Sequence, residues 1–355
     1  MLLNAFITVL VLFFFAGGAM FCFDRFGASL APGYRALSKT AMDRLSALTA
    51  RFPLALWEFL LLLLAVLFLI GLVCVIAKKK GFLKWLAWLF ILIAVLVFLF
   101  VALWGLNHYA PPISEMLELE VGEYTEEELI EATRYYMAMA ELYAGQVERT
   151  GGGELAAQDF DELAVLAGKS YAELGENYSI FRCSDAPVKK ALLTRLAFDY
   201  GGTTGLFVCF TGESTVNPNT YVASLAHTMC HEVAHRCCIA GEDEANFAAF
   251  LACSMSDDAR FLYSGYYSAF LYCYNALAEA NPSAASALWS TDYALLRLDC
   301  HAANVHYEQY DGKVQEAVNK VNDTYLKAFS EESGIRSYGE AADYLIAWYQ
   351  TRIRE

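Results

Sequence analysis

Three long apolar runs dominate the first third of the chain, at residues 3–23, 54–77 and 82–106. Each run is near or above the ~20 residues that a helix needs to cross a bilayer, so the pattern predicts three transmembrane helices. The first run could instead be a cleaved signal peptide. However, its apolar stretch exceeds the ~7 to 15 residues usual there, and no clear basic segment precedes it. We therefore predict an uncleaved anchor followed by two further spans.

From residue 107 onward the apolar positions recur at helical spacing. We expect helices at about residues 126–147, 158–171, 188–198, 221–239, 243–254, 257–280 and 283–298, with more toward the end. Strands are few, and the best candidate is residues 205–216, where β-branched and aromatic residues surround Thr211 and Gly212 as in a hairpin or an edge strand. The predicted fold is mostly α: a membrane domain at residues 1–106, then a largely helical α+β domain at residues 107–355.

Charge divides the chain at the same point. Residues 1–106 carry nine Lys and Arg against three Asp and Glu, whereas the remainder carries 16 basic and 37 acidic residues. So acidic a domain argues against a nucleic-acid partner. The first connection between spans holds five Lys and Arg over about thirty residues, but Lys78, Lys79 and Lys80 are packed into a short turn that is poorly suited to translocation. We therefore expect a multi-pass protein of the cell membrane, with a cytoplasmic N-terminus and an extracytoplasmic C-terminal domain.

Eight of the ten cysteines lie in the domain that we place outside the cytoplasm. An oxidising compartment favours disulfides, yet the spacing of these cysteines shows no disulfide framework. Cys230, Cys237 and Cys253 fall inside apolar helical patterns, which favours small buried thiols over paired cysteines.

The chemistry of the chain is concentrated at residues 227–246, where an H-E-x-x-H motif is followed by an acidic cluster. His231 and His235 are four residues apart, so on a helix both imidazoles project from one face and can hold one metal ion. Glu232 lies beside them as a candidate general base. This pattern predicts a Zn²⁺ site, which needs a third protein ligand and leaves a fourth position for water.

The third ligand must come from beyond the helix that carries the histidines. Glu242 lies seven residues after His235, which is ~10 Å of rise in an unbroken helix and too far for a shared ion. The chain must therefore turn between them. Gly241 stands where a helix C-cap glycine would, and Glu242 could open the following helix.

Three acids compete for this role: Glu242, Asp243 and Glu244. Glu242 and Asn246 are four residues apart and share a helix face, so Glu242 can bind the ion while Asn246 steadies a ligating histidine. Glu244 is the alternative ligand, and Asp243 is expected to be a solvated acid at the helix start.

The Glu-x-x-Ala-Asn sequence at residues 242–246, with its following Phe and Ala, resembles the Glu-x-x-Ala-Asp/Asn helix of gluzincin peptidases. These include membrane proteases of the heat-shock and CAAX-prenyl types. The resemblance implies that Glu242 is the third zinc ligand, with Asn246 at the last motif position. Those families usually place many more residues between the second histidine and this glutamate.

A closer resemblance spans nearly the whole chain, to a bacterial family of three-span membrane proteins that is known only as a domain of unknown function with a zincin-like site. The residues that carry it, besides the spans and the zinc motif, are 104–109, 111–112, 210–213, 263–266, 321–323 and 325–327. It implies a zincin-like C-terminal domain.

The residues and the resemblance together predict a membrane-anchored zinc metallopeptidase acting on a peptide or protein substrate beside the lipid bilayer. Glu232 would take a proton from the attacking water and pass it to the leaving amine. A strand just before the motif helix would suit main-chain pairing with an extended substrate, or would simply be a structural hairpin. The residue that stabilises the oxyanion stays open among His227, Tyr263, Tyr266, His301 and His306. The alternative function is a non-catalytic zinc-binding sensor or scaffold.

Overall fold

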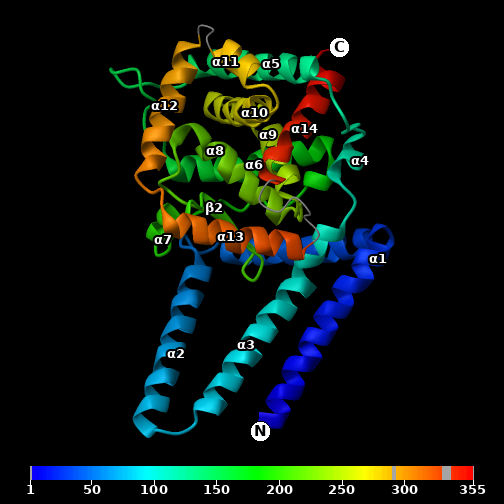
Figure 1. Cartoon of the computed structure of the whole chain (residues 1–355), viewed down its shortest axis with the longest axis vertical. Helices are drawn as coiled ribbons and strands as arrows, with labels where there is room; N and C mark the ends of the chain where they lie inside the picture. Colours follow the sequence, from blue (N-terminus) through cyan, green and yellow to red (C-terminus); the bar gives the residue numbers. More distant parts are fainter. Residues whose placement is uncertain (1, 290–292, 330–336, 355) are drawn as a thin grey trace.

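The computed structural model describes residues 2–289, 293–329 and 337–354. In this described part a helical domain with one small sheet stands on three long helices (Figure 1). The predicted mostly α fold is confirmed. The three long helices are α1 (Leu2–Thr49), α2 (Leu56–Lys78) and α3 (Phe82–Leu103), and each is long and apolar enough to cross a membrane.

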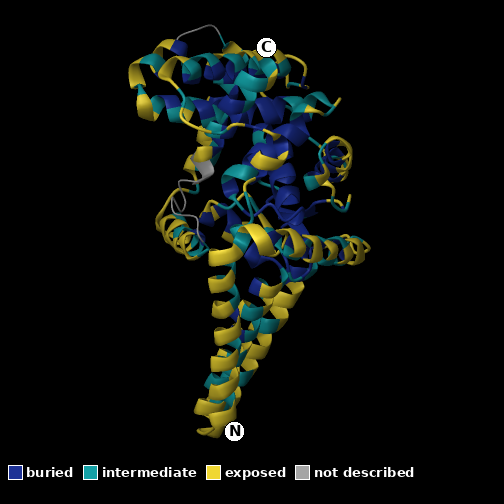
Figure 2. Ribbon diagram, turned by 90° about the vertical axis from the view of Figure 1, so that its right-hand side faces the viewer, coloured by how far each residue is buried: buried dark blue, intermediate teal, exposed yellow. Residues whose placement is uncertain are grey.

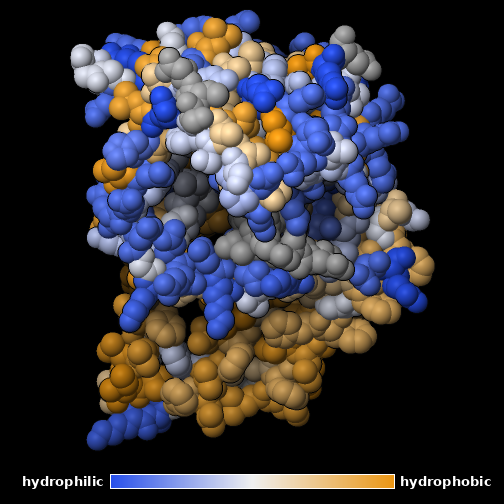
Figure 3. All heavy atoms as spheres, turned by 45° about the horizontal axis from the view of Figure 1, so that its top comes forward, coloured by the Kyte–Doolittle hydropathy of each residue, from blue (hydrophilic) through white to orange (hydrophobic). Residues whose placement is uncertain are grey.

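The surface of these helices differs sharply from that of the domain. Most of their side chains are exposed (Figure 2), and together they form a hydrophobic lower part beneath a hydrophilic domain (Figure 3). An apolar surface of this size is typical of contact with lipid. The N-terminus and the turn between α2 and α3 lie at the end of the bundle remote from the domain (Figure 1).

Helix α1 is much longer than the predicted first span. It bends at Phe26, where the backbone is not helical (φ −130, ψ 20), and then continues to Thr49 across the upper end of the spans, beneath the domain (Figure 1). The predicted loop between the first two spans is therefore wrong. The helical pattern there is hard to see because polar residues share its buried face, which comprises Ala31, Arg35, Ser38, Met42, Ser46 and Thr49.

The domain contains a further series of helices. Their bounds are η1 Gly105–Tyr109, α4 Ile113–Leu117, α5 Glu126–Ala144, α6 Phe160–Asn177, η2 Ser179–Phe181, α7 Arg195–Gly201, α8 Val222–Arg236, α9 Glu242–Ser254, α10 Ala259–Ala280, α11 Pro282–Trp289, α12 Ala294–Glu308, α13 Lys313–Ala328, α14 Ser337–Trp348 and a π-helical turn at Tyr349–Ile353. The helix predicted at 283–298 is two helices, α11 and α12, and residues 290–292 between them lie outside the described residues.

The predicted hairpin is confirmed. Strands β2 (Gly205–Val208) and β3 (Glu213–Val216) pair antiparallel, with Gly205 opposite Val216, and Gly212 takes a positive φ in the turn. A third strand, β1 (Lys189–Lys190), pairs parallel to β3, so the sheet order is β1-β3-β2 and β2 is an edge strand.

The helix predicted at residues 188–198 is therefore wrong at its start. Residues 189–190 pair with β3, and α7 begins only at Arg195. The reason is a long-range contact: the Glu58 carboxylate from α2 accepts the backbone N–H groups of Leu192, Leu193 and Thr194 just before α7. A charge that is distant in sequence thus sets where this helix starts.

Helix α8 lies in the interior of the domain, where it packs against α6, α9 and α10 and against the sheet. Thirteen of its fifteen residues are buried. The main core cluster surrounds it with aromatic and aliphatic side chains. Such close packing fixes the backbone from which the histidines of the H-E-x-x-H motif project.

The sheet and α8 rest directly on the ends of the spans. Glu213 of β3 accepts the backbone N–H groups of Leu56 and Trp57, which open α2, at 2.9 Å each. The indole N–H of Trp104, which follows α3, donates to the backbone carbonyl of His235 at 2.9 Å. The last turn of α8 is thereby bonded to the residue that ends the third span.

Cys183 and Cys237 form a disulfide, which corrects the prediction of a free thiol at Cys237. The two residues are 54 positions apart, and the segment after η2 brings Cys183 beside the end of α8, which no spacing rule reveals. Among the described residues Cys230 and Cys253 are free and buried, as predicted.

Candidate metal centre

The H-E-x-x-H motif lies on the last two turns of α8. His231 and His235 are one turn apart on the same face and are both buried or nearly so. The helix ends at Arg236, and Cys238 then takes a left-handed conformation (φ 65) that reverses the chain. Four residues after Cys238, α9 begins with Glu242.

This turn differs in detail from the one predicted. Gly241 is the N-cap of α9 in an extended conformation, whereas the left-handed residue that ends α8 is Cys238. Ending the helix three residues earlier frees the carbonyl of Ile239 for the ring of His235, at 2.9 Å from Nδ1. The early reversal thus supplies a partner that a helix continuing to 239 could not offer.

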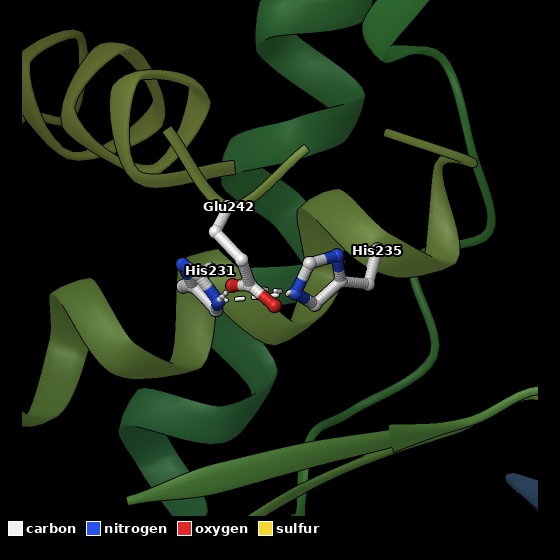
Figure 4. A group of neighbouring side chains, drawn as sticks. All are labelled: His231, His235 and Glu242. Carbon is white, nitrogen blue, oxygen red and sulfur yellow. Dashed lines mark hydrogen bonds and ion pairs between the residues drawn. The ribbon is translucent and has the colours of Figure 1, made fainter. Parts of the chain in front are cut away.

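The turn brings Glu242 back over the two histidines (Figure 4). The Nε2 atoms of His231 and His235 are 3.0 Å apart, and Glu242 Oε2 lies 3.2 Å and 3.5 Å from them. Two ligands of a tetrahedral zinc ion, at bond lengths of about 2.0–2.1 Å, would lie roughly 3.3 Å apart. The separations of these three ligand atoms therefore fit a zinc ion.

The hydrogen bonds of the two Nδ1 atoms explain why this cluster favours a bound cation. His231 Nδ1 lies 2.8 Å from Asn246 Oδ1, and His235 Nδ1 faces the Ile239 carbonyl. Both partners are oxygen acceptors, so each Nδ1 carries the proton and each neutral ring presents a lone pair at Nε2. Two lone pairs and a carboxylate thus converge on one point, and only a proton or a metal ion relieves their repulsion.

The charges of the ligands agree with this interpretation. Burial opposes protonation of His235, but the Glu242 carboxylate outweighs burial and raises the pKa of this histidine above its ordinary value. Burial likewise opposes ionisation of Glu242, yet the two histidines keep its pKa below the ordinary value. The Glu242 carboxylate thus favours positive charge at the histidines.

Glu232 lies between the two histidines in sequence and faces the sheet. Burial raises its pKa to about 7, although the histidines partly oppose the shift, and its Oε2 atom makes no hydrogen bond. The edge strand β2 touches this carboxylate: a Cβ added to Gly205 would lie 2.3 Å from Glu232 Oε1. Glu232 is thus a poorly solvated carboxylate next to an edge of the sheet. It also lies next to the triad, the name used below for His231, His235 and Glu242.

The other acids of the cluster have different surroundings. Glu244 Oε1 accepts the backbone N–H of Ile113 at 2.7 Å and the hydroxyl of Tyr344 at 3.2 Å, so its carboxylate is directed away from the triad. Asp243 lies in the first turn of α9 and is partly exposed. The structure therefore brings Glu242, not Glu244, to the histidines, and it places Asn246 against His231.

The five candidates for stabilising the oxyanion are widely dispersed. Tyr263 donates to Asp299, Tyr266 stacks on Tyr143 in the core, and His301 is exposed. His306 bonds the Asn219 carbonyl. Only His227 lies near the triad: its Nε2 is 3.2 Å from the Asn246 carbonyl, and burial with the neighbouring His231 lowers its pKa to about 3.

Two residues beside the triad were not predicted from the sequence as part of the site. Trp104 bonds the His235 carbonyl, and Tyr272 of α10 packs near His227, with ring centroids 6.0 Å apart. Burial and then the Glu242 carboxylate raise the pKa of Tyr272, which keeps its hydroxyl a donor. No sequence signal singles out Tyr272, because α10 contains five tyrosines at mixed spacing.

Comparison with known proteins identifies the family of the chain. A family model described as a protein of unknown function (DUF3810) matches residues 34–346. No curated protein and no solved structure matches the chain. The matched region includes the whole triad, while the resemblance to gluzincin peptidases stays a prediction.

Proposed function

The chain belongs to the DUF3810 family of unknown function, and we propose from its site that it is a membrane-anchored zinc metallopeptidase. One observation carries the proposal: two histidine lone pairs and the Glu242 carboxylate converge beside the unbonded carboxylate oxygen of Glu232. A triad that lacked a neighbouring base would suit a purely structural metal. The pairing of an open tetrahedral site with a buried carboxylate is typical of hydrolysis.

The side chains of the site would have the following roles in hydrolysis. A zinc ion held by the triad would act as a Lewis acid toward the scissile carbonyl and the attacking water. Glu232 would accept the proton of that water and deliver it to the leaving amine, for which a pKa near neutrality is suitable. Tyr272 is the candidate donor to the negative charge that develops on the carbonyl oxygen.

Strand β2 would align the substrate. It is the edge of the sheet, and its first residue, Gly205, packs against Glu232. An extended peptide paired with β2 would therefore pass beside the general base. This geometry favours the substrate-binding role of the hairpin over a purely structural one.

We place the domain outside the cytoplasm. The N-terminus and Lys78, Lys79 and Lys80 share the end of the bundle that is remote from the domain (Figure 1). The density of lysines in that turn favours a cytoplasmic position for it. Partners of the chain would then be the lipid bilayer and an extracytoplasmic peptide or protein.

The test is the variant Glu232→Gln in the full chain purified in detergent. Because Glu232 does not belong to the triad, we expect a zinc content equal to that of the wild type, with hydrolysis of a peptide library reduced at least a hundredfold. Unchanged hydrolysis would refute the proposed role of Glu232. A wild-type protein that retains one zinc ion but cleaves no peptide would instead favour a zinc-binding sensor or scaffold.

A further inference from the structure

A cavity of about 490 Å³ adjoins the metal centre. Its wall includes His227 and Thr228, which lie on the turn of α8 just before His231, and Tyr272 of α10. On the other side it is lined by the segment that connects α7 to β2 and by the start of α13. Its volume is within the range of about 300–1,000 Å³ that is typical of ligand sites. The cavity is therefore large enough for a substrate residue next to the scissile bond.

The lining of this cavity is acidic. Among the described residues that line it there is no Lys or Arg, whereas two acidic residues, Asp199 and Asp311, belong to the lining. Asp199 is buried, and the side-chain amides of Asn217 and Asn219 hold its Oδ1 at 2.7 Å and 3.0 Å. Arg195, which is half exposed, forms an ion pair with Oδ2 at 3.8 Å. A buried carboxylate fixed by two amides is a built feature of the site.

Aromatic rings and hydroxyl groups complete the lining. Tyr272, Tyr307 and Tyr310 contribute to the wall, and the Tyr310 hydroxyl accepts the Asn219 amide that also holds Asp199. Tyrosine faces attract a cation, and a carboxylate in a partly desolvated site attracts it more strongly. An anionic or purely apolar group would gain neither interaction.

We propose that this cavity is a specificity pocket for a cationic side chain, Lys or Arg, of a polypeptide substrate. The proposal rests on the proposed peptidase function for the role of the pocket, but not for its ability to bind. Asp199 would pair with the ammonium or guanidinium group, and Asp311 at the rim would add a second negative charge. The excess of acidic over basic residues after residue 106 would attract the same substrates at longer range.

Binding can be measured apart from hydrolysis. The full-length Glu232→Gln variant, loaded with zinc, is titrated with fluorescent alanine-based peptides that carry a single Lys, norleucine or Glu. We expect the Lys peptide to bind at least tenfold more tightly than the norleucine peptide and the Glu peptide to bind most weakly. Equal affinities for the three peptides would overturn the proposal.

Two pocket variants and one control variant locate the effect. Asp199→Asn keeps an oxygen acceptor for both amides and should reduce the preference for Lys to within about twofold. Gln315→Lys adds a cation to the wall from helix α13 and should reverse the preference toward Glu, with thermal unfolding as the check that the variant is folded. Glu176→Gln removes one exposed charge elsewhere and should change nothing. A preference for Lys that survives both pocket variants would refute the assignment.

The wild-type protein separates failure of the pocket from failure of the peptidase. Cleavage sites in a peptide library should show Lys or Arg enriched at one fixed position from the scissile bond. Cleavage without such enrichment would overturn the pocket and leave hydrolysis intact. Binding selective for Lys without any cleavage would support the pocket and overturn the peptidase.

Discussion

Replacing Gly205 by Ala should disable the general base without touching the metal. A Cβ at this position would lie 2.3 Å from Oε1, 2.7 Å from Cγ and 2.8 Å from Cδ of Glu232. Ordinary contacts between such atoms are about 3.5–4.0 Å, so the carboxylate must move by roughly 1 Å. A misplacement of about 1 Å can reduce a rate by about a hundredfold, which corresponds to about 2.7 kcal/mol.

Stability should change little in this variant, because the clashing atoms belong to one side chain and not to the backbone. The φ of Gly205 is not in the left-handed region, and Ala reduces the entropy of the unfolded chain, so the change in the free energy of unfolding should stay within about 1 kcal/mol. The triad is untouched, and zinc content should be that of the wild type.

The assay compares kcat/KM for a cleaved library peptide, zinc content by mass spectrometry and thermal unfolding. Gly122→Ala is the matched control, because a Cβ there meets no atom within 4 Å. Activity of Gly205→Ala within twofold of the wild type, with zinc bound, would refute the reasoning about Glu232. Loss of zinc would show that the substitution disturbs the triad itself.

The remaining predictions concern the ligands and their support. Glu242→Gln should weaken zinc binding at least a hundredfold in a chelator competition. Glu244→Gln should keep zinc and lose only about 1 kcal/mol of stability, because an amide oxygen accepts the Ile113 N–H more weakly than the carboxylate does. The reverse pattern would make Glu244 the ligand. Asn246→Ala should weaken zinc binding by about 10- to 100-fold, because His231 loses its acceptor at Nδ1; unaltered affinity would exclude this orienting role.

The sequence was most informative where the interactions are local. Helical spacing places His231 and His235 on one face, and the need for a turn before Glu242 follows from the rise of a helix. The hairpin at Thr211 and Gly212 is likewise encoded by neighbouring residues. Each of these features depends on a few consecutive positions, so a pattern is enough to find it.

The predictions from sequence are wrong or incomplete where a contact with a residue distant in sequence determines the local structure. Glu58 from α2 delays the start of α7, and polar residues buried under the domain conceal the second half of α1. Cys183 reaches Cys237 only because α8 ends beside the segment that follows η2. Tyr272 faces the site because of how α10 packs on α8, and not because of its neighbours in sequence.

The predicted boundary at residue 106 divides the sequence more cleanly than it divides the interactions. Glu213 of the domain bonds the first N–H groups of α2, Glu58 of α2 bonds those before α7, and Trp104 after α3 bonds the carbonyl of His235. Removing α1–α3 would leave Glu213 with Lys189 as its remaining partner and the His235 carbonyl with the Cys238 N–H alone. It would also take the Glu58 acceptor from the N–H groups of Leu192, Leu193 and Thr194. A hydrogen bond to a charged group contributes about 1.5–3 kcal/mol. A total loss on this scale is a large fraction of the stability of a typical domain, so the geometry of the candidate metal centre depends on the three long apolar helices as well as on the motif.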